Sequence, residues 1–215
     1  SYFDYIIPAD AHRIMILKGG PGVGKSTFMK KIADRMVEKG FDVELHHCSS
    51  DDDSLDAVVI PKLGVALLDG TSPHIVDPKY PGAVDEIIHM GDYWDEAGIR
   101  KHKEEIIAIN RMTGKMFQRA YRFLRAAKAI HEDVESVVSE GLDYGLANQK
   151  AAALSETIFD GYSVGERVGF CRKLFGSAIT PKGFVHHLET GFAPYQRVWI
   201  VTGEAGTGKA TLIAK

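Results

Sequence analysis

The sequence predicts an α/β fold built on a parallel β-sheet with helices on both faces. Three short runs, over residues 12–18, 42–48 and 63–69, have the length of strands, and the first and third also have the aliphatic content of buried strands. An amphipathic segment over residues 26–39 lies between the first two runs and has the period of a helix. Strands that alternate with helices in this order indicate parallel strands joined by helical crossovers.

The first predicted strand and the helix are joined by a glycine-rich loop. Residues 12–18 (HRIMILK) are mainly aliphatic and lead directly into two glycines. Apolar side chains then recur at helical spacing until Gly40 ends the helix. These apolar positions are Phe28, Met29, Ile32, Met36 and Val37. The second strand (DVELHHC) runs into a polar SSDDD loop, and the third (LGVALLD) ends at Asp69.

A helical insertion is expected after the third strand, over about residues 83–159, with helices at 106–138 and 144–159. At 100° per residue the apolar side chains of the longer helix share one arc, and basic side chains occupy the opposite arc. The apolar arc comprises Ile106, Ile109, Met112, Met116, Phe117, Ala120, Phe123, Leu124, Ala127, Ile130 and Val134. The basic arc comprises Arg111, Lys115, Arg119, Arg122 and Arg125.

The end of the chain repeats its beginning. Residues 12–31 (HRIMILKGGPGVGKSTFMKK) align without gaps over residues 196–215 (QRVWIVTGEAGTGKATLIAK). A repeat at domain length indicates duplication, so we expect one α/β domain over residues 1–160 and the start of a second over residues 161–215. The second copy stops inside its first helix, and the chain is therefore expected to be a fragment of a longer, tandem protein.

Composition favours an ordinary globular protein of the cytoplasm. The 215-residue chain has a formal net charge of −3, which gives no global reason to expect a nucleic acid or a membrane as partner. Its apolar runs fall well short of the roughly 18 residues that indicate a membrane span, and no secretory signal is visible. Cys48 and Cys171 are far apart and are expected to be reduced thiols.

Residues 19–26 (GGPGVGKS) match the G-x-x-x-x-G-K-[ST] pattern of a P-loop, also called Walker A. Glycines allow successive backbone N–H groups to face phosphate oxygens, and the following helix adds its positive N-terminal end. Lys25 is expected to reach the β- and γ-phosphates of ATP, and the Ser26 hydroxyl to bind Mg²⁺. The predicted nucleotide-binding residues are Gly20, Pro21, Gly22, Val23, Gly24, Lys25, Ser26 and Thr27.

Asp69 is the expected acidic partner of this loop. Four apolar residues precede it, which places the carboxylate at the carboxyl end of a buried strand, where ligands of parallel sheets bind. Asp69 would hold Mg²⁺ as a Walker B acid, so Lys25 and Asp69 are the predicted catalytic residues and Ser26 and Asp69 the predicted metal ligands. Gly70 stands where many ATPases have a glutamate, and the guanine-recognition motif N-K-x-D is absent from the sequence. The general base is therefore unassigned.

Candidates for orienting the attacking group lie in the loops after the second and third strands. They are Asp51, Asp52, Asp53, Thr71, Ser72 and His74. The alternative is that the aspartates form a solvated loop that caps a following helix, and that His74 is an ordinary loop residue. The run His46-His47-Cys48 lacks a second ligand pair at metal-like spacing, which favours a core or sheet-edge role over a zinc site.

Two further features bear on function. In the second loop (GEAGTGKA), Ala210 replaces the hydroxyl residue that should bind Mg²⁺, so impaired metal chemistry is expected there. The basic helix over residues 111–125 has three interpretations: a lid over the phosphates, a contact for a second substrate, nucleic acid or another anionic partner, or a solvated face.

Several segments beyond the P-loop carry a more specific resemblance. They are LHHCSS at 45–50, IPKLG at 60–64, DGTSPH at 69–74, AITPKG at 178–183 and the second loop. Together with the first loop they resemble a family of largely uncharacterised bacterial ATPases with two P-loop domains in tandem. The resemblance implies ATP binding and hydrolysis with Lys25, Ser26 and Asp69 as site residues, and Ala210 departs from its pattern.

The sequence thus predicts a Mg²⁺-dependent P-loop ATPase, a hydrolase. Two alternatives stay open: a kinase for a small molecule or nucleotide, and a nucleotide-controlled binding protein for nucleic acid or a protein partner.

Overall fold

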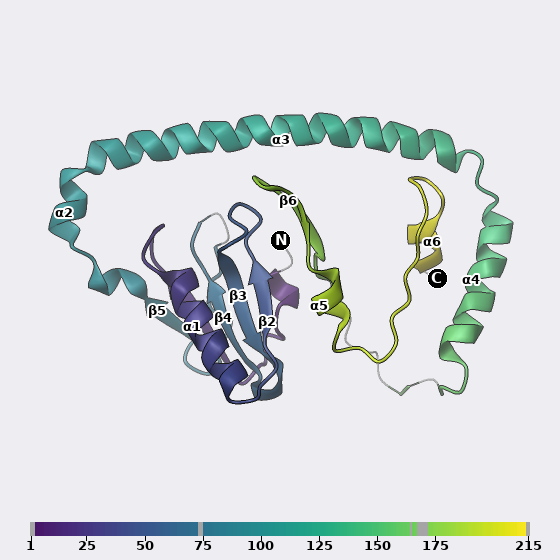
Figure 1. Cartoon of the computed structure of the whole chain (residues 1–215), viewed down its shortest axis with the longest axis horizontal. Coiled ribbons are helices and arrows are strands. Elements are labelled where there is room, and N and C mark those ends of the chain that lie inside the picture. Colours follow the sequence, from purple (N-terminus) through teal and green to yellow (C-terminus); the bar gives the residue numbers. More distant parts are fainter. Residues whose placement is uncertain (1–2, 73–74, 164, 167–171, 214–215) are drawn as a thin grey trace. The chain divides into compact units, whose positions relative to one another are not determined.

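The computed structural model describes residues 3–72, 75–163, 165–166 and 172–213 (Figure 1). The chain divides into two compact units, each described separately below. The first comprises Ser1–Ile99 with Phe170–Gln196, and the second Arg100–Gly169 with Arg197–Lys215. The boundaries of these units do not coincide with the predicted domain boundary at residue 160. The division into two P-loop domains stays a prediction.

The first unit contains a five-stranded sheet in the order β2-β3-β4-β1-β5. Its strands are β1 (Arg13–Lys18), β2 (Glu44–His47), β3 (Leu55–Ile60), β4 (Val65–Asp69) and β5 (Asp85–His89). β1 pairs in parallel with β4 and β5, whereas β3 is antiparallel to both β2 and β4. The α/β class is confirmed, but the expectation of a purely parallel sheet is wrong because the sheet is mixed.

The antiparallel strand β3 explains this difference. The chain passes from β3 to β4 through a single 3₁₀ turn, η2 (Pro61–Leu63), and Gly64, whose φ is +62°. So short a connection permits only an antiparallel neighbour, since a parallel crossover needs a dozen or more residues. The SSDDD loop therefore leads into a strand and does not cap a helix.

β5 corrects the predicted start of the helical insertion. Its residues lie inside the segment 83–159 that was expected to be helical, yet they pair with β1 at the edge of the sheet. Ile87 on this strand is about half exposed. The helices that follow begin only at α2 (Glu96–Lys101), after the 3₁₀ turn η3 (Met90–Tyr93).

The helix α1 (Lys25–Glu38) covers one face of the sheet. Its buried Met29 and Ala33 pack into a cluster with strand residues Leu17, Leu55, Val58, Ile60 and Leu67. The spacing of four residues places Met29 and Ala33 on the same side of the helix, which is why this side faces the core. The predicted helix over residues 26–39 is thus confirmed within one residue at each end.

The opposite face is covered by the N-terminal segment. Ile6 and Ile7, which follow the 3₁₀ turn η1 (Phe3–Tyr5), are buried there against Ile14 and Ile16 of β1. Among the described residues, this cluster is closed by η1 and loop residues and includes no α-helix. The expectation of helices on both faces is therefore wrong on this side.

A hairpin and a short helix complete the first unit. The hairpin consists of β6 (Ser177–Thr180) and β7 (Gly183–His186), and α5 (Leu188–Phe192) follows it. The Arg172 guanidinium joins this part of the unit to the rest. It makes a two-pronged ion pair with Glu44 and donates to the carbonyl oxygens of Tyr5 and Ile6.

The second unit contains the two helices predicted over residues 106–138 and 144–159, which are confirmed. It contains α3 (Lys103–Ser139), α4 (Tyr144–Phe159) and α6 (Lys209–Ile213). None of the side chains of α3 is buried, so its apolar arc and its basic arc are both accessible. Phe123, for example, is 66% exposed. Among the described residues, no helix has the length and hydrophobicity required to cross a membrane.

Candidate phosphate-binding site

The candidate site lies where β1 and β4 end side by side. These two strands are parallel neighbours, with Leu17 of β1 opposite Asp69 of β4. The loop that follows β1 therefore begins next to the Asp69 carboxylate. The sequence prediction that Asp69 and the glycine-rich loop share the carboxyl edge of the sheet is confirmed.

The glycines of the loop have backbone conformations that other residues rarely adopt. The φ angles of Gly22 and Gly24 are +80° and +86°, in the left-handed region. A Cβ atom on Gly19 would lie 2.9 Å from the Val23 side chain. The loop thus curls tightly, and its shape favours glycine at positions 19, 22 and 24.

The curled loop leaves backbone donors free. Within the described part of the chain, the N–H groups of residues 22–27 have no protein acceptor. Gly24 is the N-cap of α1 and contributes no side-chain cap. Free N–H groups at a helix N-terminus favour an anion through hydrogen bonds and the helix dipole. This arrangement fits a phosphate group.

Lys25 lies inside this loop. Its side chain is about 9% exposed, and its ammonium group donates to the carbonyl oxygens of Gly19 and Gly20 at 2.8 and 3.0 Å. The same nitrogen lies 3.6 Å from Oδ2 of Asp69. The loop carbonyls and the Asp69 carboxylate therefore hold the Lys25 ammonium at the loop. In this position its positive charge would meet an incoming anion.

Two side chains of the site have oxygen atoms that could bind magnesium. The Asp69 carboxylate accepts a hydrogen bond from the Thr71 backbone N–H at 2.9 Å and another from the Thr71 hydroxyl. Ser26, in the first turn of α1, accepts a hydrogen bond from the Leu55 N–H at 3.1 Å. A carboxylate and a hydroxyl are the oxygen ligands that Mg²⁺ prefers. Thr71 orients the Asp69 carboxylate, and its predicted role toward an attacking group stays a prediction.

Two aspartates after β2 form contacts, one within their own loop and one with the β6–β7 hairpin. Asp51 accepts from the Ser54 hydroxyl at 2.6 Å, and Asp53 pairs with Lys182 at 2.7 Å. The lysine lowers the pKa of the Asp53 carboxyl. Ser72 is exposed. His74 lies outside the described residues, as does Cys171, and their predictions stay untested.

Cys48 is a free thiol, as predicted. The residue is partly buried, and burial raises the pKa of its thiol. A raised pKa reduces the thiolate fraction, so this cysteine is poorly suited to nucleophilic chemistry.

Sequence reasoning missed two side chains that border the loop. The indole of Trp94, which follows η3, lies about 3.4 Å from where a Cβ on Gly20 would stand. Lys18 donates to the carbonyl oxygens of Gly70 and Val76 at 2.8 and 2.7 Å, and thereby holds the segment after Asp69. Both contacts join segments far apart in sequence, and no local pattern signals them.

The second loop repeats the backbone of the first. The φ angles of Gly203, Gly206 and Gly208 are +158°, +75° and +85°, beside +157°, +80° and +86° for Gly19, Gly22 and Gly24. Lys209 donates to the carbonyl of Glu204 as Lys25 does to that of Gly20.

The surroundings of the second loop are different. Residues 197–202 do not form a strand. Within the second unit the loop lies close to α3, since a Cβ on Gly206 would stand 2.6 Å from the Glu135 carbonyl oxygen. The copy therefore reproduces the loop without the strand that leads into the first one.

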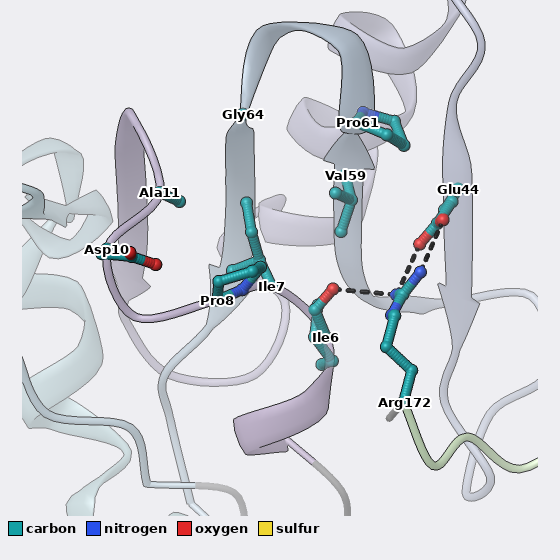
Figure 2. A pocket seen from close by; sticks show the side chains of 10 residues that line it. All are labelled: Ile6, Ile7, Pro8, Asp10, Ala11, Glu44, Val59, Pro61, Gly64 and Arg172. Atoms are coloured by element: carbon teal, nitrogen blue, oxygen red, sulfur yellow. Dashed lines mark hydrogen bonds and ion pairs between the residues drawn. The ribbon is translucent and has the colours of Figure 1, made fainter. Parts of the chain in front are cut away.

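Figure 2 shows the side chains that line a hollow elsewhere in the first unit. Gly64 precedes β4 and Ala11 precedes β1, so the hollow lies at the amino end of these strands, opposite the loop. The Arg172–Glu44 ion pair forms one side of it. The glycine-rich loop is thus separate from this hollow.

Comparison with known proteins identified no relative. No protein-family model matches the chain, and neither the curated proteins nor the solved structures contain a significant match. The resemblance to tandem P-loop ATPases therefore stays a prediction from the motifs.

Proposed function

We propose that the chain binds ATP with Mg²⁺ at residues 19–27 and hydrolyses it. The observation that carries this proposal is the position of Lys25, whose ammonium lies between the loop carbonyls and Asp69 beside unpaired N–H groups. A charged donor and several backbone donors at one helix N-terminus form a site for a polyphosphate.

Each residue of the site has a distinct task in this proposal. The N–H groups of residues 22–27 bind phosphate oxygens, and Lys25 exchanges its carbonyl contacts for the terminal phosphates. Ser26 and Asp69 hold Mg²⁺, which when bound neutralises charge on the phosphates. Thr71 keeps the Asp69 carboxylate oriented through its two hydrogen bonds. The residue that activates water is not assigned.

Binding is tested by intrinsic fluorescence. The chain has two tryptophans, and Trp94 lies against the loop, so a Trp199→Phe background leaves one reporter at the site. Addition of Mg²⁺-ATP is expected to change the Trp94 emission. In this background Lys25→Ala should weaken ATP binding about 10- to 100-fold, since hydrogen bonds to charged groups contribute about 1.5–3 kcal/mol.

The repeat supplies a matched control. Lys209→Ala removes the corresponding lysine of the second loop and should leave the Trp94 response unchanged. Equal ATP affinity in the Lys25→Ala and Lys209→Ala proteins, measured in parallel by equilibrium dialysis, would show that the loop at residues 19–27 is not the nucleotide site.

Hydrolysis is tested by release of ADP without an added acceptor. Asp69→Asn should reduce the Mg²⁺-dependent rate at least tenfold, whereas Asp77→Asn, an exposed acid at the same edge, should not. ADP release that requires a nucleoside or metabolite would instead support a kinase.

A nucleotide-controlled binding protein is the second candidate, because the basic arc of α3 is exposed along its length. Five cations on one accessible helix face suit a polyanion. Salt-sensitive binding of DNA or RNA, lost on Arg119→Gln with Arg122→Gln, would favour this candidate. Absence of such binding at low salt would refute it.

A further inference from the structure

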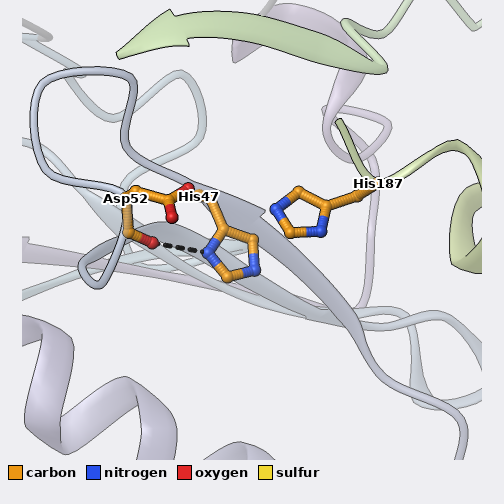
Figure 3. A group of neighbouring side chains, drawn as sticks. All are labelled: His47, Asp52 and His187. Carbon is orange, nitrogen blue, oxygen red and sulfur yellow. Dashed lines mark hydrogen bonds between the residues drawn. The ribbon is translucent and has the colours of Figure 1, made fainter. Parts of the chain in front are cut away.

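Two histidines and an aspartate from distant parts of the sequence meet at the edge of the first unit (Figure 3). His47 ends β2, Asp52 lies in the loop that follows it, and His187 follows β7. One ligand atom from each of the three side chains lies within 4.8 Å of the other two. The imidazole rings of His47 and His187 stack with their centroids 4.4 Å apart.

A neighbouring carbonyl selects the tautomer of His47. Nδ1 of His47 lies 2.9 Å from the backbone oxygen of Asp52. A carbonyl oxygen only accepts hydrogen bonds, so in the neutral ring Nδ1 carries the proton and Nε2 has the lone pair. Metal-binding histidines in proteins usually have this arrangement, in which one ring nitrogen donates to a backbone carbonyl and the other binds the ion.

A second contact holds the same two segments together. Lys182, in the turn between β6 and β7, forms an ion pair with Asp53, the neighbour of Asp52. The stacking of His187 on His47 and the Lys182–Asp53 ion pair thus both join the hairpin region to the end of β2 and the loop after it. The three candidate ligands are brought together by the fold of this unit.

We propose that His47, Asp52 and His187 bind a divalent transition-metal ion of the zinc type. Imidazole nitrogens favour Zn²⁺, Co²⁺ or Ni²⁺ over Mg²⁺, which prefers oxygen ligands. Three protein ligands leave a tetrahedral ion one position for water. To bind the ion, the exposed His187 ring would rotate about its side-chain torsions out of the stacked position. The lone pair of one of its ring nitrogens would then face the ion. The ion would then clamp the segment after β7 to the sheet edge.

The experiment measures binding of Zn²⁺ and Co²⁺ to the whole chain. Isothermal titration should show one Zn²⁺ site, and Co²⁺ should give the visible absorption of a four-coordinate ion with nitrogen ligands. His47→Ala and His187→Ala should each weaken Zn²⁺ binding at least tenfold, since loss of an outer-shell partner alone costs about 10- to 100-fold. Mg²⁺ at the same concentration should not compete.

His186→Ala is the matched control, because His186 is an exposed neighbour outside the cluster. It should bind Zn²⁺ as the unaltered protein does, and Zn²⁺ should raise the melting temperature of both. Zn²⁺ affinity that is the same in His47→Ala, His187→Ala and His186→Ala would overturn the proposal, as would the lack of a Co²⁺ spectrum. Circular dichroism verifies that each variant is folded. These readouts involve no nucleotide and are independent of the proposed ATPase activity.

Discussion

The Arg172–Glu44 ion pair is expected to stabilise the first unit by an amount that depends on pH. The guanidinium donates to the two Glu44 carboxylate oxygens at 2.9 and 2.8 Å and to the carbonyls of Tyr5 and Ile6 at 3.1 and 2.9 Å. Hydrogen bonding from Arg172, with a smaller contribution from His46, lowers the pKa of Glu44 to about 2. One side chain thus links the N-terminal segment, the start of β2 and the region before the β6–β7 hairpin.

The size of the effect follows from this pKa. At about 1.4 kcal/mol per pKa unit, the lowering from 4.5 corresponds to roughly 3 kcal/mol. About a third of the Glu44 side chain is exposed, so solvent screening reduces the contribution to about 1–2 kcal/mol. Glu44→Gln, which keeps the shape and removes the charge, should lower the free energy of unfolding by that amount at pH 7.

The pH dependence has a defined sign. A carboxyl whose folded-state pKa is depressed contributes fully above its unfolded-state pKa, here about 4.5, and loses the contribution as the pH falls toward 2. Urea unfolding of the unaltered protein and of Glu44→Gln should therefore give a difference that is constant above pH 5 and shrinks below it. Glu189→Gln, at an exposed acid of α5, is the control. A difference that is absent at pH 7, or unchanged down to pH 2.5, would refute the reasoning.

Two further substitutions test local features. Gly24→Ala places a side chain at φ +86°, a strain of about 1–2 kcal/mol that should weaken ATP binding roughly tenfold; Gly114→Ala, in the middle of α3 with open space around it, should leave binding unchanged. Asp85→Ala removes a buried acceptor of the Lys79 and Tyr80 N–H groups at 3.0 and 2.6 Å, which should cost about 1–3 kcal/mol in urea unfolding. Unaltered unfolding of the Asp85 variant would show that these N–H groups find other partners.

The elements that sequence analysis predicted well are those specified by neighbouring residues. The strand, loop and helix around residues 13–38 carry aliphatic periodicity, glycines at turn positions and a helix-ending Gly40, all within one continuous segment. Asp69 was placed at the site edge because a buried strand leads directly into it. These inferences needed no knowledge of distant contacts.

The missed strands carry weaker local signals. β3 (LDAVVI) follows a run of aspartates that is also typical of a helix cap, and its return to β4 depends on the single turn at Gly64. β5 (DEIIH) has only two apolar residues in five and precedes helical sequence. Its strand conformation depends on pairing with β1, and such pairing is a tertiary effect that local propensity does not record.

The contacts of the hairpin region could not be predicted from one sequence. Arg172 and His187 are separated by the entire helical segment from their partners Glu44 and His47. Charged and imidazole side chains are common on protein surfaces, so residue type alone does not predict which of them will be in contact. The sequence around His46-His47-Cys48 contains no second pair of metal ligands and therefore argued against a zinc site. The fold brings a further candidate ligand to His47 from a distant part of the chain.

Comparison of the two glycine-rich loops shows which features of the site come from the loop sequence and which come from the neighbouring sheet. Their glycine φ angles agree within about 5°, although one loop follows β1 and the other follows a segment that is not a strand. The loop conformation is therefore a property of the short sequence itself. The carboxylate beside Lys25, in contrast, comes from β4, which reaches the loop only by pairing with β1. A lysine in a curled loop becomes a candidate nucleotide site through that neighbouring strand, and for this reason the proposed activity is assigned to Lys25 and Asp69 together.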